Sequence, residues 1–364
     1  MGFKESEVMD AYKEKVVEGF YDPVRNERYS YFDEGGMLFD SVSSIMEAVS
    51  VLEKTPGDIF GSESFRIGGS LILSYDQECV ISAALIKYAK IERGMVLFKV
   101  NPYVSAFYEC YKEIKLSNPH KASWSELPEC FDGLNRFVAA VRERISSGAF
   151  KRQISAHVRA ANKNCSGLLR YIDALFARHS RLLVLRIDFS YGKGGLEIEG
   201  VSALRDRLNM LRVVSEKISR HRVELIGYLK NKRAELGMVG FVWKLEYGRE
   251  KGHHYHMMFF LDGAKVRQDI VIAKRIGEYW NNVITQGKGV YYNCNGDKGK
   301  YKYCGVGMIS YNDAEGLHNL KKAAVYLAKV DRYISACMPE GKRTFGKGNT
   351  PKPSERSAGR PRQY

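Results

Sequence analysis

The amino-acid sequence predicts an α+β fold for the C-terminal part of the chain, and three observations support this class. Residues 182–190 alternate in polarity as a strand with one buried face does. Residues 240–263 contain two more strand patterns, joined across a glycine-bounded turn at residues 248–252. Residues 202–235 and 313–336 carry apolar side chains at helical spacing. Strand and helix patterns therefore alternate along this part of the sequence.

The predicted strand at residues 182–190 has two different faces. Its odd positions, including Leu183 and Ile187, are apolar throughout. Its even positions change from apolar residues to Arg186 and Asp188. Successive side chains of a strand point to opposite faces, so we expect one face to belong to the core and the other to become polar.

Length and charge predict two domains and a tail. The chain has 364 residues, and single hydrophobic cores rarely grow beyond about 250 residues. We expect an acidic, mixed and largely helical accessory domain at residues 1–147, a basic domain at 148–338 and a basic disordered tail at 339–364. Residues 1–150 carry 17 Lys and Arg against 23 Asp and Glu, although the whole chain has a net charge of +15. The positive charge therefore belongs to the C-terminal part.

Such an asymmetry is typical of a domain that binds a polyanion, because Lys and Arg release the counterions condensed on phosphates. Nucleic acid is the leading expected partner. A basic surface that serves solubility, or one that faces an anionic membrane, is an open alternative. Residues 202–235 are especially basic. Their basic side chains, which include Arg205 and Arg212, either follow the phosphates of a nucleic acid or form an ordinary solvated helix face.

Composition and motifs exclude several classes. Hydrophobic residues make up 45% of the chain, and no apolar run is long enough to span a membrane. Seven scattered cysteines without a C-x-x-C pair indicate reduced thiols in a cytoplasm rather than a disulfide framework. Residues 341–348 approach the spacing of a phosphate-binding loop, but Gly348 stands where a magnesium-binding Ser or Thr is required. We therefore expect no nucleotide-driven motor.

The histidines at residues 253–256 lie in the predicted hairpin, and strand parity selects two of them as ligands. If paired residues have numbers that sum to 500, Glu246 lies opposite His254. Glu246, His254 and His256 then share one face, which we expect to be exposed, while the apolar odd positions face the core. His253 has the opposite parity and is left out of the ligand set.

Two imidazoles and one carboxylate on a rigid sheet suit a divalent cation that keeps open positions for a substrate. Zinc, nickel or manganese would all be compatible with the imidazoles, so the residues leave the metal open. The alternative is that closely spaced histidines only form hydrogen bonds on a polar face of the sheet.

The helix predicted within residues 313–336 has a second set of chemically active residues. Lys322, Tyr326, Lys329 and Tyr333 follow one another at steps of four, three and four, so they share a helix face. A tyrosine between lysines is suited to attack a phosphodiester, because neighbouring cations favour the phenolate. An ordinary amphipathic helix with a solvated basic face is the alternative.

Together these residues resemble the histidine-hydrophobe-histidine (HUH) endonuclease superfamily, which includes rolling-circle replication initiators. The sequence is most similar to the phage and prophage YagK/YfjJ C-terminal domain family, which is related to filamentous-phage initiators. The likeness covers roughly residues 150–338 through four segments, LVLRID at 183–188, WKLE at 243–246, GHHYH at 252–256 and YLAK at 326–329.

The resemblance implies a ferredoxin-like antiparallel sheet with helices packed on one face. It implies Mg²⁺ or Mn²⁺ bound by His254 and His256, with Glu246 as third ligand. It further implies that Tyr326 is the nucleophile and that Lys329 orients the phosphate. Some initiators use two tyrosines four residues apart, but Val330 occupies that position here.

The hypothesis is a bacterial cytoplasmic enzyme that nicks and rejoins single-stranded DNA at an origin through a 5'-phosphotyrosine link. It would work with a host helicase and polymerase and would not bind a membrane. Candidate DNA contacts are Lys322, Arg186, Arg205, Arg212 and Lys244. The alternatives are a non-catalytic DNA-binding regulator of a phage or mobile element, a zinc hydrolase with Glu246 or Glu250 as general base, and a transposase or relaxase with the same chemistry.

Overall fold

The computed structural model of the chain describes residues 17–22, 27–32, 34–60, 65–67, 70–72, 98–114, 116, 127–192, 204–248, 252–301, 303–329, 334–336 and 342–352. The chain divides into two compact units. The first unit comprises Met1–Gly35, Asn162–Val330 and Ser335–Tyr364, and the second comprises Gly36–Ala161 and Asp331–Ile334. No helix within the described ranges combines the length and apolar character needed to cross a membrane.

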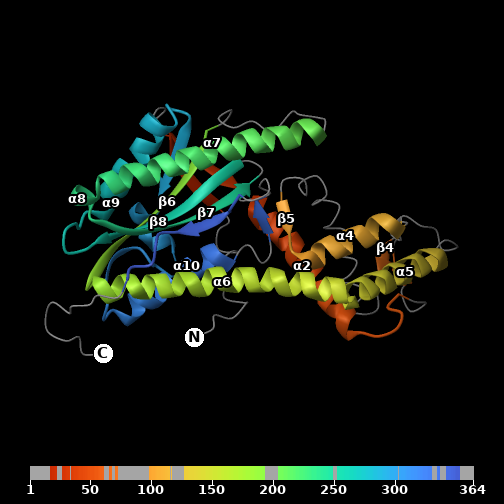
Figure 1. The fold of residues 1–364 in the computed structure, drawn as a ribbon. Helices are drawn as coiled ribbons and strands as arrows, with labels where there is room; N and C mark the ends of the chain where they lie inside the picture. Colours follow the sequence, from red (N-terminus) through yellow and green to blue (C-terminus); the bar gives the residue numbers. More distant parts are fainter. Residues whose placement is uncertain are drawn as a thin grey trace. The chain divides into compact units, whose positions relative to one another are not determined.

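The first unit is built on an open, eight-stranded antiparallel sheet among the described residues (Figure 1). The strand order along the main path is β12-β7-β8-β6-β9-β1-β2, and β10 pairs with the first half of β6. The strands are β1 (Val17–Asp22), β2 (Glu27–Phe32), β6 (Arg181–Tyr191), β7 (Met238–Gly248), β8 (Gly252–Asp262), β9 (Gly289–Asn293), β10 (Gly307–Ser310) and β12 (Phe345–Lys347). The expected α+β class with an antiparallel sheet is confirmed.

Helices cover both faces of this sheet, whereas we expected them on one face (Figure 1). On the face of the odd-numbered β8 residues, α7 (Leu204–Asn231) approaches closely enough for Tyr255 to donate a hydrogen bond to its Ile218 carbonyl. On the opposite face, Tyr171 of α6 (Gly148–Arg178) packs edge-on against Phe260. Both faces of the central strands are apolar over much of their length, so both must be covered.

The remaining long helices of the first unit also pack on one or the other face of the sheet. α9 (Asp269–Tyr279) and η1 (Trp280–Ile284) pack on the α7 face, where Trp280 contacts Phe189. α10 (Ala314–Lys329) lies beside α6, to which Lys321 is joined by an ion pair with Asp173 at 2.7 Å. The short elements are α8 (Arg233–Leu236), η2 (Cys294–Gly296), η3 (Lys298–Lys300) and β11 (Ile334–Ala336).

The hairpin formed by β7 and β8 has the register that residue parity predicts. From Phe241 to Gly248, each residue of β7 pairs with the residue of β8 whose number completes a sum of 500, so Glu246 lies opposite His254. An irregularity between Met238 and Gly240 shifts the register at the far end of the hairpin. The three candidate ligands therefore share one face, as expected.

The division between the two compact units falls within α6, between Ala161 and Asn162. The segment up to Gly35 belongs to the first unit, and its strand β1 pairs with β9 of the sheet. Within the segment that was expected to be a disordered tail, Phe345 to Lys347 pair with β7 as an edge strand. Short edge strands of this kind carry little sequence signal of their own.

The described part of the second unit is mainly helical, with α2 (Glu34–Lys54), α4 (Pro102–Ile114) and α5 (Leu127–Ser146). Phe107 of α4 meets Phe137 of α5 edge to face, at 4.9 Å between ring centroids. Arg142 donates hydrogen bonds to the Leu52, Thr55 and Gly57 carbonyls and so satisfies acceptors at the end of α2. The short strands here are β3 (Phe65–Ile67), β4 (Ser70–Ile72) and β5 (Phe98–Val100).

Candidate metal centre

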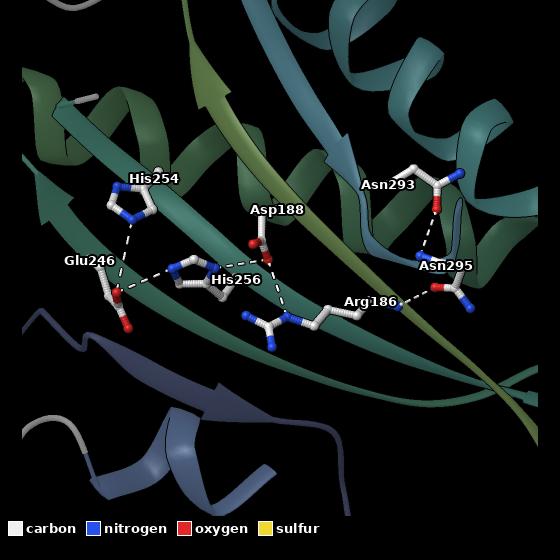
Figure 2. A network of polar contacts seen from close by, with 7 residues as sticks. All are labelled: Arg186, Asp188, Glu246, His254, His256, Asn293 and Asn295. Atoms are coloured by element: carbon white, nitrogen blue, oxygen red, sulfur yellow. Dashed lines mark hydrogen bonds and ion pairs between the residues drawn. The ribbon is translucent and has the colours of Figure 1, made fainter. Parts of the chain in front are cut away.

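Three potential ligands converge where β7 and β8 lie side by side (Figure 2). The ligand atoms of Glu246, His254 and His256 all lie within 4.8 Å of one another. Glu246 Oε2 is 3.1 Å from His256 Nε2 and 3.9 Å from His254 Nε2. Both imidazoles thus present their Nε2 atoms to one carboxylate oxygen, Glu246 Oε2. This arrangement follows from the period of two along β8 and from the cross-strand pairing of Glu246 with His254.

The centre is buried, although we expected this face of the hairpin to be exposed. His254 is 6% exposed and His256 only 1%, and the Glu246 side chain retains 14% exposure. β12 and β6 flank the hairpin in the sheet, and α10 packs against β7. Parity correctly predicts which side chains meet, but it carries no information about what packs over them.

Each histidine is oriented through its Nδ1 atom. His254 Nδ1 lies 3.1 Å from the Gly252 carbonyl oxygen, which accepts a hydrogen bond from it. His256 Nδ1 lies 2.8 Å from Asp188 Oδ1 on the neighbouring strand β6 (Figure 2). A proton on Nδ1 leaves Nε2 as the atom available to bind a metal, and this use of the second nitrogen is typical of histidines at metal sites.

The donor set suits a cation on chemical grounds. A lone pair on Nε2 of His256 would face the Glu246 carboxylate across 3.1 Å, so a proton or a cation must lie between them. Two neutral imidazoles and one carboxylate supply three ligands and leave further coordination positions for water or substrate. The residues present therefore fit a divalent metal ion.

Asp188 is the site residue that the sequence interpretation missed. It is 1% exposed and pairs in register with His256 across β6 and β8. Arg186, two residues earlier on the same face, lies 3.6 Å from Asp188 through Nε. The sequence signal for Asp188 was the change from apolar to polar residues at the even positions of β6. The local sequence, however, does not indicate which strand lies beside β8.

Asn295 holds this part of β6 in place (Figure 2). β10 pairs with β6 as far as Val184 and β9 pairs from Ile187 onward, so residues between them lack a strand partner on that side. The Asn295 side chain accepts a hydrogen bond from the Arg186 amide at 2.9 Å and donates one to the Val184 carbonyl at 2.9 Å. It thereby replaces the missing strand pairing next to Arg186 and Asp188.

His253 lies on the other face and serves no ligand role. Its side chain is buried, and loss of hydration together with the neighbouring His254 lowers the pKa of its imidazole to about 3. The histidine therefore stays neutral inside the fold over the physiological range. This placement agrees with its exclusion from the predicted ligand set.

The residues of this centre lie within the part of the chain that a family model matches. The model of the YagK/YfjJ C-terminal domain matches residues 149–348. The chain belongs to this family. Searches of curated proteins and of solved structures found no match. The matched region of the YagK/YfjJ domain contains the two histidines, Glu246 and Asp188, and it extends to the edge strand β12.

The candidate nucleophile of this YagK/YfjJ domain lies in α10, which packs against β7 and β10. The Tyr326 side chain is 4% exposed, and Lys322, one turn earlier, is half-buried. The helix ends at Lys329, whose side chain lies outside the described residues, as does Tyr333. The helix is therefore shorter than the segment 313–336 in which it was expected.

The candidate DNA contacts of the YagK/YfjJ domain occupy different environments. Lys244 is completely buried in register with His256, and Arg186 is 6% exposed beside Asp188. Burial favours a role for these two cations inside the centre over contact with a DNA backbone. Arg212 is exposed on α7 and forms an ion pair with Glu216. Arg205 is in the same helix, but its side chain lies outside the described residues.

Replacing Asp188 with Asn should weaken binding of Mn²⁺ by about 10–100-fold, because the second partner of His256 loses its negative charge. Isothermal titration calorimetry with MnCl₂ measures the affinity, and the melting temperature in EDTA reports the fold. Asp173→Asn, which changes an exposed carboxylate on α6, is the matched control and should bind Mn²⁺ like the wild type. Undiminished affinity in a folded Asp188→Asn variant would contradict this role.

His253 should make the protein less stable as the pH falls. Its pKa is about 3 in the fold, against an ordinary value of 6.5 for histidine, so the unfolded chain binds one more proton between these two pH values. The free energy of unfolding then falls by up to about 1.4 kcal/mol per pH unit from this group. Urea unfolding in EDTA at pH 7, 6 and 5 should show a shallower slope for His253→Gln than for the wild type. The exposed His318→Gln is the control, and equal slopes for wild type and His253→Gln would refute the assignment.

Proposed function

We propose that this protein is a metal-dependent endonuclease of the HUH type that nicks and rejoins single-stranded DNA through a covalent 5'-phosphotyrosine intermediate. The observation that carries the proposal is the convergence of His254, His256 and Glu246 through atoms within 4.8 Å. The two histidines flank the single hydrophobic residue Tyr255, as the superfamily pattern requires. The antiparallel sheet supports a ferredoxin-like core, although helices on both faces and the added strands extend beyond that plan.

Mg²⁺ or Mn²⁺ is the proposed cofactor, held by His254 Nε2, His256 Nε2 and Glu246. When bound, the ion polarises a phosphoryl oxygen and stabilises the negative charge that develops there. Glu246 supplies a hard oxygen ligand, which favours these ions over softer metals. Asp188 keeps the His256 ring in the orientation that binding requires.

Tyr326 is the proposed nucleophile. Its phenol gives up its proton to solvent, the oxygen attacks the scissile phosphorus, a new O–P bond forms to the tyrosine, and the bond from phosphorus to the 3'-oxygen breaks. The departing 3'-oxygen takes up a proton from solvent, which balances the one lost by the phenol, and rejoining reverses the same exchange. Support comes from the packing of α10 against β7, the strand that carries Glu246. Lys329 is proposed to orient the phosphate.

The basic character of the chain beyond residue 150 supports DNA as the substrate. A free 3'-hydroxyl would serve a host polymerase, and duplex opening would require a host helicase, because the chain contains no complete phosphate-binding loop. Origin DNA is the proposed target within a phage or prophage replication system.

Tyr326→Phe should lose covalent capture of DNA. The wild type incubated with 3'-labelled single-stranded oligonucleotides spanning the origin and with MnCl₂ should yield a labelled protein–DNA adduct on a denaturing gel. Phe lacks the attacking oxygen but keeps the ring, so the adduct should fall to background. Tyr333→Phe is the matched control and should retain the adduct. Full capture by Tyr326→Phe would remove this residue as nucleophile, and cleavage without any adduct would indicate a hydrolase.

Replacing both His254 and His256 with Ala should abolish nicking while most DNA binding remains. The metal ligands are lost, but the Lys and Arg side chains that contact phosphates are unchanged. Nicking in MnCl₂ and fluorescence anisotropy with labelled DNA in EDTA measure the two properties separately. Persistent nicking by the double variant would contradict the metal assignment, and metal-independent binding without nicking by the wild type would favour a DNA-binding regulator.

A further inference from the structure

A group of tyrosines alternates with cations beside the metal centre. We call it the tyrosine–cation surface, and its members are Tyr292, Tyr301, Tyr303, Lys300 and Lys322, next to the buried Arg186. Lys322 Nζ lies 3.8 Å from the centre of the Tyr303 ring, and Lys300 Nζ lies 5.4 Å from that of Tyr292. Arg186 Cζ lies 5.8 Å from the centre of the Tyr301 ring. Each of the three rings is half-buried, so part of each is open to solvent.

The surface adjoins the candidate centre at two places. Tyr292 of β9 pairs in register with Asp188, so its side chain lies on the same sheet face as His256. The segment that contains Tyr303 lies directly against α10, because a Cβ added to Gly305 would come within 2.7 Å of the Leu320 backbone. Lys322 then precedes Tyr326 by one turn on the same helix face. The surface therefore extends from the metal ligands to the helix of the proposed nucleophile.

Two of the rings are held in fixed, uncharged positions. The Tyr292 hydroxyl donates a hydrogen bond to Asp297 Oδ2 at 2.8 Å. Burial is the main cause that raises the pKa of Tyr292, and the nearby Asp297 adds to it. Burial is likewise the main cause that raises the pKa of Tyr301, and Cys294 adds to it. Neutral rings in fixed orientations lose little conformational freedom when a flat ligand stacks on them.

We propose that the tyrosine–cation surface binds single-stranded nucleic acid, with unpaired bases stacked on the tyrosines and backbone phosphates held by Lys300 and Lys322. Stacking on aromatic rings combined with a positively charged track is how proteins bind single strands of varied sequence. The bases of a duplex are stacked on one another and cannot offer a free face to these rings. The inference deepens the proposed function, on which it rests, by assigning the residues that hold the strand.

Tyr303→Leu and Lys322→Ala should weaken binding in two different ways. Fluorescence anisotropy with labelled oligothymidine in EDTA measures affinity at several salt concentrations, without metal and hence without nicking. Tyr303→Leu should weaken binding by about fivefold or more with an unchanged salt slope, whereas Tyr303→Phe should bind like the wild type. Lys322→Ala should reduce the slope of log K against log salt by about 0.7, because one phosphate contact is lost.

The control variants lie on the α7 face of the sheet. Tyr228, which stacks on Tyr279 at 3.6 Å, is a tyrosine of comparable burial, and Tyr228→Leu should keep wild-type affinity. Lys274→Ala on α9 should keep the wild-type salt slope. A duplex of the same length should be bound with no difference between Tyr303→Leu and the wild type.

Each other outcome overturns a distinct statement. Wild-type affinity in Tyr303→Leu, or an equal loss in Tyr228→Leu, would refute the tyrosine–cation surface and leave the nicking activity of Tyr326 to its own test. A changed salt slope in Tyr303→Leu would also refute stacking, since the ring carries no charge. Failure of the wild-type protein to bind oligothymidine would refute this surface, which is proposed to hold single strands of varied sequence, and would leave the nicking of origin DNA to its own test.

Discussion

The register of the β7–β8 hairpin is the constraint on which the candidate centre depends. Side chains alternate with a period of two, so a slip of one residue would turn His254 and His256 to the opposite face. The pairing of Glu246 with His254 brings a carboxylate from one strand to the two imidazoles of the other. Apolar side chains at the odd positions secure this register, because burying them under α7 requires the even positions to face the other way.

Burial of the centre creates a second requirement, since buried charges are costly unless they are paired. Asp188 lies between His256 and Arg186, and Asn295 bonds the Arg186 amide. The stretch of β6 next to Asp188 lies where its strand partner changes from β10 to β9, and the Asn295 amide fills that gap. The Asn295 side chain, which is distant in sequence, thus holds the part of the β6 backbone that carries Asp188, the residue that orients His256.

One face of the sheet collects most of the chemistry proposed for this protein. The metal ligands, the buried Lys244 and Tyr292 lie on it, and α10 with Tyr326 packs on the same side as α6. The opposite face is occupied by the aromatic contacts of Phe189, Trp280 and Tyr255 with α7 and its neighbours. Separation of this kind lets the sheet support a polar centre while the other face supplies apolar burial.

Local patterns were sufficient for the mixture of strands and helices, the hairpin and its register, because a strand pair joined by a short turn is governed by parity and turn length alone. The antiparallel sheet as a whole was expected from the family resemblance. Local patterns were also sufficient to choose His254, His256 and Glu246 and to exclude His253. They could not reveal Asp188 as a neighbour of His256, the strand β12 at the sheet edge, the pairing of β1 with β9 or the helices on both faces. Those features arise from contacts between segments far apart in the chain, and such contacts leave no periodic signal within either segment.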